Sequence, residues 1–258
     1  MKHLKSLRDF IVELESIGDL QRIATEVDLD LEIGAICRRC YETGAAAPLF
    51  ENIKGIQKGF RVLGAPGGVS ARANMSLARI ALAMGLPPDT RGRAIVESLV
   101  QARRRTPIPP TIVSEGPVKQ NVLKGDQVDL LRLPAPLLHD GDGGGYLNTF
   151  GIVVVETPDK KWCNWSIARI MVLDKNRMAG IIAPNQHIGM VRQQWTDLGN
   201  DMPFALVLGA EPFIPFVGGM PLPEYSKSAI SWARILASPS RSQSARPLIW
   251  KCQRQQKS

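Results

Sequence analysis

The sequence Thr149-Phe-Gly-Ile-Val-Val-Val-Glu-Thr157 is followed, after a turn at Pro158-Asp159, by Trp162-Cys-Asn-Trp-Ser-Ile-Ala-Arg169. Short β-branched runs between turn residues are typical of strands. Four further runs are expected as strands, over Val128–Leu133, Trp162–Val172, Gly180–Ala183 and Phe204–Leu208, with a helix over His187–Leu198. Strands about ten residues apart with tight turns predict an antiparallel sheet or a small barrel in this half of the chain.

The first hundred residues have a different pattern, in which apolar residues recur at spacings of three and four. This spacing predicts amphipathic helices, which we expect over residues 3–17, 31–43, 75–84 and 91–104. Short strands are expected over residues 20–27, 48–52 and 60–64. A proline-rich connector, Thr106-Pro-Ile-Pro-Pro-Thr-Ile-Val113, follows. The expected fold class is therefore α+β, with an N-terminal α/β domain over 1–105 and a second domain over 106–224.

Composition and charge narrow the class of protein. The chain has 258 residues, 44% of them hydrophobic and 22% charged, which excludes disorder, collagen and coiled coil. Residues 1–224 hold 25 Lys and Arg against 24 Asp and Glu, whereas residues 225–258 hold seven Lys and Arg and no acid. We expect this basic tail to be solvated and flexible. A nucleic-acid-binding role would depend on the tail alone, and no stacking or zinc motif accompanies it.

The N-terminal residues and the most apolar stretch lead us to expect neither a targeting signal nor a membrane-spanning segment. Residues 204–222 contain an acid and are broken by prolines and glycines, so no membrane-spanning helix is expected. The first ten residues mix both signs of charge and lack an apolar core. A cytoplasmic location is the resulting expectation.

Two of the four cysteines, Cys37 and Cys40, form a Cys-x-x-Cys pair. A zinc site needs four ligands, and no second pair or histidine cluster completes this one. A redox pair would stand at the start of a helix after a strand, whereas these two lie inside a helical pattern. The favoured interpretation is two structural thiols on one amphipathic helix.

Three groups of polar residues could carry chemistry. Asn164, Ser166 and Arg169 interrupt an apolar strand pattern, where buried polar atoms need partners; the alternative is an exposed face that ends in an arginine. Regular alternation along one strand would put Asn164 and Arg169 on opposite faces. Gln186-His187 stands at the expected start of a helix, which suits a phosphate, while imidazole suits a metal; a structural histidine is the alternative.

Two glycine-rich segments complete the candidates. Gly218-Gly-Met-Pro-Leu-Pro is a turn whose backbone can approach a ligand closely. Asp140-Gly-Asp-Gly-Gly-Gly lacks the ligand spacing of a calcium loop and the Lys-Ser/Thr of a phosphate loop. We interpret it as a turn before a strand.

Together these residues resemble the UbiD-type decarboxylase family, and within it the fungal ferulic acid (phenylacrylic acid) decarboxylases. The resemblance covers about residues 5–223. It is carried by the segments Ala47-Pro-Leu-Phe, Leu63-Gly-Ala-Pro-Gly, Leu133-Pro-Ala-Pro-Leu-Leu-His, Asn164-Trp-Ser-Ile-Ala-Arg169, Gln186-His-Ile and Gly219-Met-Pro-Leu-Pro. The Asn-Trp-Ser-Ile-Ala-Arg string is the most specific of them, and the others keep its order and spacing.

The resemblance implies an enzyme that removes CO2, without net oxidation, from α,β-unsaturated aromatic acids of the cinnamic or ferulic type by using prenylated FMN. It implies a split β-barrel flavin-binding domain over 106–224, a flavin prenyltransferase that supplies the cofactor, and a homodimer formed through a C-terminal domain. No membrane or nucleic-acid partner is expected.

The site residues that the resemblance implies are assigned by motif match. Asn164 and His187 would ligate Mn2+ or Mg2+. Backbone carbonyls of Trp165, Gly218 and Met220 would lie near K+. The cofactor would be lined by Thr149, Asn164, Trp165, Ser166, Ile167, Ala168, Arg169, Gln186, His187, Met220 and Pro221. Arg169 would be the catalytic residue, because a guanidinium can hold a carboxylate through two hydrogen bonds.

The sequence departs from the family pattern after about residue 224. The family's metal-binding glutamate falls near Ser228 in an ungapped comparison, and Glu224 is the only acid nearby. The two glutamates that work with the arginine have no counterpart here. We therefore expect a truncated or altered version of a longer protein. An alternative is a flavin-binding remnant that has lost catalysis and associates with a full-length homologue.

Overall fold

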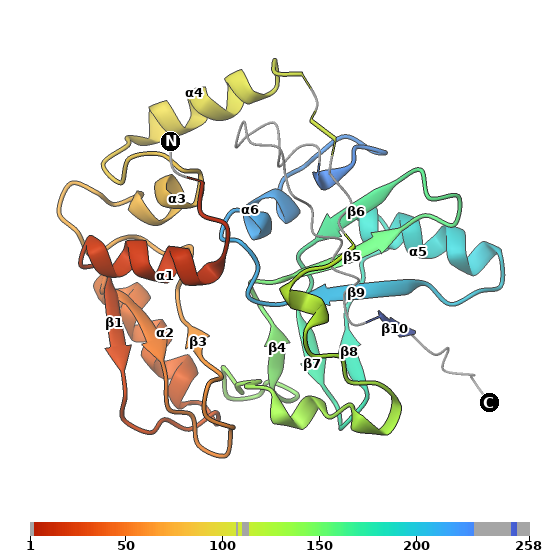
Figure 1. Ribbon diagram of the computed structural model, residues 1–258, viewed down its shortest axis with the longest axis horizontal. Helices are drawn as coiled ribbons and strands as arrows, with labels where there is room; N and C mark the ends of the chain where they lie inside the picture. Colours follow the sequence, from red (N-terminus) through yellow and green to blue (C-terminus); the bar gives the residue numbers. More distant parts are fainter. Residues whose placement is uncertain (1–2, 107, 110–113, 230–248, 252–258) are drawn as a thin grey trace. The chain divides into compact units, whose positions relative to one another are not determined.

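The computed structural model describes residues 3–106, 108–109, 114–229 and 249–251 (Figure 1). The chain forms two compact units, each built from several segments. The first unit comprises Met1–Val100, Leu123–Thr149 and Arg169–Gly180, and the second comprises Gln101–Val122, Phe150–Ala168 and Ile181–Ser258. The fold is α+β, as the sequence predicts.

The first unit begins with a three-stranded sheet and its helices. These elements are α1 (Leu7–Ser16), β1 (Leu20–Ile23), α2 (Glu32–Thr43), β2 (Ala47–Phe50), β3 (Val62–Leu63), α3 (Ala78–Ala83) and α4 (Gly92–Ala102). The sheet order is β1-β2-β3, with β1 parallel and β3 antiparallel to β2. Phe10 and Leu14 of α1 pack against Ala47 of β2. The predicted helices of this region are confirmed, and α3 is shorter than predicted.

A buried ion pair fixes α3 to the end of α1. Arg79 is 1% exposed and donates two hydrogen bonds to the Asp19 carboxylate, from Nε at 2.9 Å and from Nη2 at 3.0 Å. Two further N–H groups donate to the carbonyls of Ala65 and Ala45, both at 2.9 Å. The Asp19 Oδ1 atom also accepts from the Ala71 N–H. These partners satisfy the buried groups, and removing either member of the pair would leave the other charge buried without its counter-charge.

A second sheet belongs to the same unit and has the order β4-β7-β8. Its strands are β4 (Tyr146–Asn148), β7 (Ile170–Val172) and β8 (Met178–Gly180). The segment before β4 lies against α2, where a Cβ on Gly34 would stand 2.1 Å from the Leu138 carbonyl oxygen. Only glycine permits this approach. The Asp140-Gly-Asp-Gly-Gly-Gly segment is a turn, closed by a hydrogen bond from the His139 N–H to Asp142.

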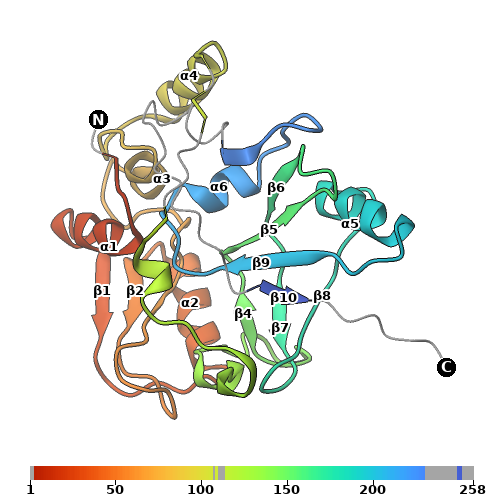
Figure 2. The same ribbon diagram turned by 45° about the vertical axis from the view of Figure 1, so that its right-hand side comes forward.

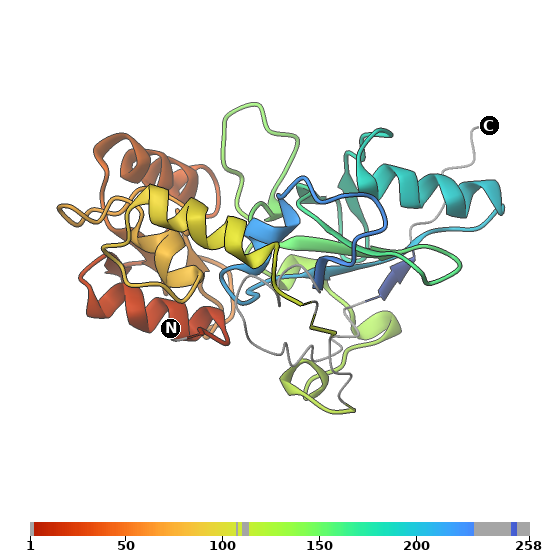
Figure 3. The same cartoon turned by 90° about the horizontal axis from the view of Figure 1, so that it is seen from above.

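The second unit contains a four-stranded sheet of order β10-β9-β5-β6 (Figure 2). Its strands are β5 (Ile152–Glu156), β6 (Cys163–Ser166), β9 (Pro203–Val207) and β10 (Ile249–Lys251). All neighbours in this sheet are antiparallel. Two helices, α5 (His187–Asp197) and α6 (Ile214–Gly218), both contact β5 and β6, and Figure 3 shows α5 alongside the sheet.

Three predicted strands are wrong. Residues 128–133 form a 3-10 turn, η3 (Leu130–Arg132), because the Asp129 carboxylate accepts from the Leu131 N–H at 3.0 Å and caps it. The strand expected over Trp162–Val172 divides into β6 and β7, which pair in different sheets. The strand expected over Gly180–Ala183 is β8, which ends at Gly180.

The thiols of Cys37 and Cys40 lie on α2, as predicted, and neither is paired. Burial raises the pKa of the Cys37 thiol to about 11, and burial also raises the pKa of the Cys40 thiol. Both are therefore neutral near pH 7, which agrees with structural thiols. No helix in the described part of the chain combines the length and apolar character needed to cross a bilayer.

Candidate functional site

Strand β6 carries two polar side chains on one face. Asn164 pairs with Val155 and Ser166 with Val153, and both valines are buried. Alternate residues of a strand share a face, so Asn164 and Ser166 point to the same side of the sheet. Asn164 is 3% exposed, and its Nδ2 donates to the Ser166 hydroxyl at 2.6 Å. This bond uses one of the two Nδ2 hydrogens, so the second amide hydrogen and the amide oxygen can both face a ligand.

The predicted partner of Asn164, His187, is the first residue of α5. Its ring contacts the indole of Trp162, with ring centroids 4.9 Å apart and planes at 69°. Trp162 is fully buried and stands two residues before Asn164 on the extended chain that leads into β6. One indole therefore fixes the start of α5 beside the start of β6. Gln186 precedes the helix as its N-cap and is exposed.

The segment Tyr225–Ser228 makes three contacts here, two with Trp162 and one with Trp165 of β6. The Tyr225 ring lies 5.0 Å from the Trp162 ring at 35°, and Trp162 Nε1 donates to the Ser226 carbonyl at 3.2 Å. The Trp165 N–H donates to the Ser228 hydroxyl at 3.1 Å, and Ser228 is fully buried. This segment thus closes one side of the Asn164 region.

Trp162 and this segment are the main site features that sequence reasoning misses. A tryptophan in an apolar run resembles an ordinary core residue, so its contacts could not be anticipated. The one sequence feature that pointed to this segment was the alignment with the family pattern, which places Ser228 near the family's metal-binding glutamate.

The glycine turn after α6 lies against the end of β6. A Cβ on Gly218 would stand 3.0 Å from Ile152 Cγ2, and one on Gly219 would stand 3.4 Å from Ile167 Cδ1. The structure thus brings the predicted residues Gly218 and Ile167 together. Met220 is half-buried and follows this turn, and its carbonyl accepts from the Leu222 N–H at 2.8 Å. Pro221 is exposed.

The remaining predicted residues lie on connections between the sheets. Thr149 is exposed on the β4–β5 connection. Arg169 is exposed on the β6–β7 connection, directly after Ala168. The expectation that Asn164 and Arg169 lie on opposite faces of one strand is therefore wrong, because β6 ends at Ser166.

One acidic and one basic side chain, Glu156 and Lys227, lie near Cys163 of β6. Burial raises the pKa of the Cys163 thiol to about 11; the Glu156 carboxylate also raises this pKa, and the Lys227 ammonium lowers it. Lys227 therefore adds positive charge beside β6, on the same segment that carries Ser228. The neighbouring donors, an amide, an imidazole and hydroxyls, suit the phosphate end of a flavin.

The same residues do not fit a divalent ion held by the protein. Asn164 and His187 are neutral ligands, and Mn2+ and Mg2+ prefer anionic oxygen ligands. Among the described residues, no group of three or more His, Cys, Asp or Glu side chains could share a metal ion. The buried group on the segment that covers β6 is a serine hydroxyl, not a carboxylate.

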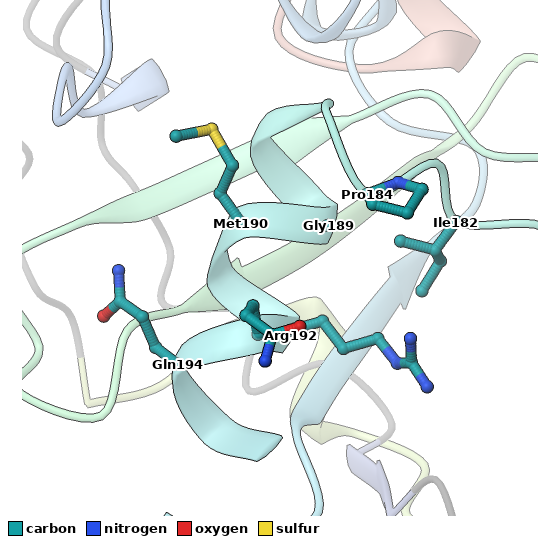
Figure 4. Close-up of a pocket in the computed structure, with 7 residues that line it drawn as sticks. Ile182, Pro184, Gly189, Met190, Arg192 and Gln194 are labelled. Carbon is teal, nitrogen blue, oxygen red and sulfur yellow. The ribbon is translucent and has the colours of Figure 1, made fainter. Parts of the chain in front are cut away.

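A hollow of about 400 Å³ lies on another part of α5 (Figure 4). Its lining residues are Ile182, Pro184, Gly189, Met190, Arg192, Gln193 and Gln194. None of the predicted site residues lines it, so this hollow is separate from the residues on β6.

Comparison with known proteins identifies two matching family models. Residues 11–99 match the N-terminal domain of 3-octaprenyl-4-hydroxybenzoate carboxy-lyase, called UbiD_N, and residues 111–239 match its Rift-related domain, called UbiD. These matches include all predicted site residues.

Similar curated proteins are decarboxylases. The chain is 50% identical over 217 residues to a pyrrole-2-carboxylic acid decarboxylase of Pseudomonas aeruginosa, and 42% identical over 222 residues to ferulic acid decarboxylase 1 of Saccharomyces cerevisiae. Each alignment covers 84% of this chain and 44% of the relative. The chain thus spans less than half the length of these curated relatives.

A solved structure shares the fold. It is an evolved dimeric form of the UbiD-class enzyme HmfF from Pelotomaculum thermopropionicum in complex with prFMN, with a TM-score of 0.77 and 27% identity. The match covers 92% of this chain and 52% of that one.

Proposed function

The chain belongs to the UbiD family of carboxy-lyases. On this premise we propose that the protein is an enzyme that decarboxylates aromatic or heteroaromatic acids with a flavin-derived cofactor. The observation that carries the proposal is the polar face of β6. Asn164 and Ser166 are joined by a hydrogen bond there, and Trp162 holds His187 against the start of the strand. Such preoriented polar groups in an apolar sheet are typical of a ligand site.

The proposed substrates are α,β-unsaturated aromatic acids of the cinnamic or ferulic type. Identity to the yeast ferulic acid decarboxylase supports this class. The higher identity to the pyrrole-2-carboxylic acid decarboxylase makes a heteroaromatic acid the alternative to be tested beside it.

The proposed cofactor is prenylated FMN, which when bound supplies the electron sink for loss of CO2. The protein's part is binding and orientation. Asn164, Ser166 and the start of α5 at Gln186 and His187 would hold the phosphate end. Thr149, Trp165, Ile167, Ala168, Met220 and Pro221 would line the remainder. A split-barrel architecture around the cofactor is proposed with it.

Arg169 is the proposed catalytic residue. Its side chain is exposed on the β6–β7 connection, directly after the residues proposed to bind the cofactor. A guanidinium stays charged throughout the working pH range and can hold a substrate carboxylate with two parallel hydrogen bonds. This would orient the carboxyl group for departure.

Proposed partners are a flavin prenyltransferase, which supplies the cofactor, and a second protein chain, since the solved relative is described as dimeric. The alternative function is cofactor binding without turnover, in association with a longer homologue. The neutral donor set at Asn164 and His187 favours that alternative.

The test is to co-express the chain with a flavin prenyltransferase and to read bound cofactor by absorbance and mass spectrometry. Turnover is then assayed with cinnamate, ferulate and pyrrole-2-carboxylate. Arg169→Ala should abolish turnover, whereas Arg177→Ala, on an exposed turn and paired with Asp174 at 2.5 Å, should not. A chain that binds no flavin would refute the proposal, and bound flavin without turnover would favour the alternative.

A further inference from the structure

The face of β6 that carries Asn164 and Ser166 presents no carboxylate among the strand's own residues and those of the covering segment Tyr225–Ser228. Glu156 pairs with Cys163, whose side chain lies on the opposite face, and Glu224 is exposed just before the covering segment. The polar groups around this face are the Asn164 amide, the His187 imidazole and the hydroxyls of Ser166 and Ser228. None of these groups carries a negative charge, and Lys227 adds a positive charge nearby. Residues 225–258 contain no Asp or Glu, so that part of the sequence cannot supply an acid.

Ser228 occupies the position from which a carboxylate could complete a cation site with Asn164 and His187. It is fully buried, and its hydroxyl accepts from the N–H of Trp165, the residue next to Asn164. A carboxylate would be stabilised at this position, because the backbone N–H would donate a hydrogen bond to the anion. A hydroxyl accepts the same hydrogen bond without bringing charge, so the position is filled by a side chain that binds Mn2+ and Mg2+ weakly.

We propose that Asn164 and His187 of this chain do not hold a divalent cation, because the position that would complete a cation site carries Ser228. A phosphate group at this place is instead held directly, by the hydrogen-bond donors of β6 and the start of α5. This inference rests on the proposed flavin-binding role, which concerns the same residues.

The first experiment titrates Mn2+ into the flavin-free chain and follows the free Mn2+ signal by electron paramagnetic resonance. The unmodified chain should show no site with a dissociation constant below the millimolar range. Ser228→Asp should bind Mn2+ at least about tenfold more tightly than Ser228→Asn. Asparagine is the matched control, since it has the size of aspartate without the charge.

The gain must depend on the predicted ligands. Adding His187→Ala to Ser228→Asp should abolish the new binding. Tight Mn2+ binding by the unmodified chain that is lost in His187→Ala would overturn the proposal, and so would equal affinities of the Asp and Asn variants.

The second experiment uses the unmodified chain with FMN, which avoids any effect of a buried substitution on folding. FMN affinity should be unchanged by EDTA or by added Mn2+. Release of FMN by EDTA would overturn the proposal. Absence of FMN binding under all conditions would refute the proposed function instead, and the Mn2+ titrations would still decide this inference.

Discussion

Replacing Trp162 tests whether one indole holds the candidate site together. Its Nε1 donates to the Ser226 carbonyl at 3.2 Å, and its ring contacts both His187 and Tyr225. In Trp162→Phe the ring contacts are kept in part, but the Ser226 carbonyl loses its donor. This acceptor is part-buried, and the smaller ring also leaves part of the fully buried Trp162 volume empty, so we expect a loss of about 2 kcal/mol in the free energy of unfolding.

Trp162→Leu should cost more, because both aromatic contacts are also lost. Each such pair contributes about 0.5–1.5 kcal/mol, which brings the expected total to about 3–5 kcal/mol. Urea unfolding followed by circular dichroism at 222 nm measures both variants. With a slope of about 2 kcal/mol per molar urea, Trp162→Phe should lower the midpoint by about 1 M. FMN affinity should fall in Trp162→Leu, because His187 loses its support.

Trp195→Phe is the matched control for this prediction. Trp195 Nε1 donates to the Glu156 carbonyl at 2.8 Å, but at an exposed position where water can replace the donor. Its loss should therefore cost less than about 1 kcal/mol and leave FMN affinity unchanged. If Trp162→Phe and Trp195→Phe shifted the midpoint equally, the assignment of Trp162 as the support of the site would be refuted.

Three further predictions concern the first unit. Arg79→Met should lower the free energy of unfolding by about 3–5 kcal/mol, because Asp19 stays buried without its counter-charge. The double variant Asp19→Leu/Arg79→Met should lose less stability than the sum of the two single variants. Additive losses in urea unfolding would contradict this prediction. Cys37 titrates from a normal pKa when unfolded but from about 11 when folded. The unfolded state therefore releases its proton first, and stability measured in urea should fall as pH rises from about 9 to 11, a fall that Cys37→Ala should reduce. Gly34→Ala should prevent stable folding, because its Cβ would meet the Leu138 carbonyl at 2.1 Å; a soluble variant with an unchanged circular dichroism melting curve would argue against the close approach.

Local sequence signals predicted the elements that depend on local chemistry. The three- and four-residue spacing located α1 and α2, and the valines of residues 152–155 located β5. The sequence analysis missed elements whose ends are set by a single side chain. At Asp129, for example, the carboxylate caps a 3-10 turn in a segment whose residue pattern is typical of a strand. The break after Ser166 was also missed. Residues Ile170–Val172 pair with β4 and β8, in a different sheet from β6, and only those distant partners define the break.

In the candidate site, too, local motifs could be recognised in the sequence, whereas contacts with distant residues could not. Motif order selected Asn164 and His187, and the structure places the His187 ring against Trp162, two residues before Asn164. The covering segment could not be predicted, because its contacts join residues more than sixty positions apart. The roles of the site residues stay predictions until the experiments above are done.

The distance along the chain between β6 and its covering segment also has a consequence during synthesis. Ser226 and Ser228 follow their partners Trp162 and Trp165 by 64 and 63 residues. At about 5–20 residues per second, a ribosome needs about 3–13 s to add that stretch. Strand β5 gains its second neighbour, β9, only within the same interval. During those seconds the nascent chain presents the Trp162 indole without its Ser226 partner and β5 with one open edge, which exposes this hairpin to chaperones and to aggregation.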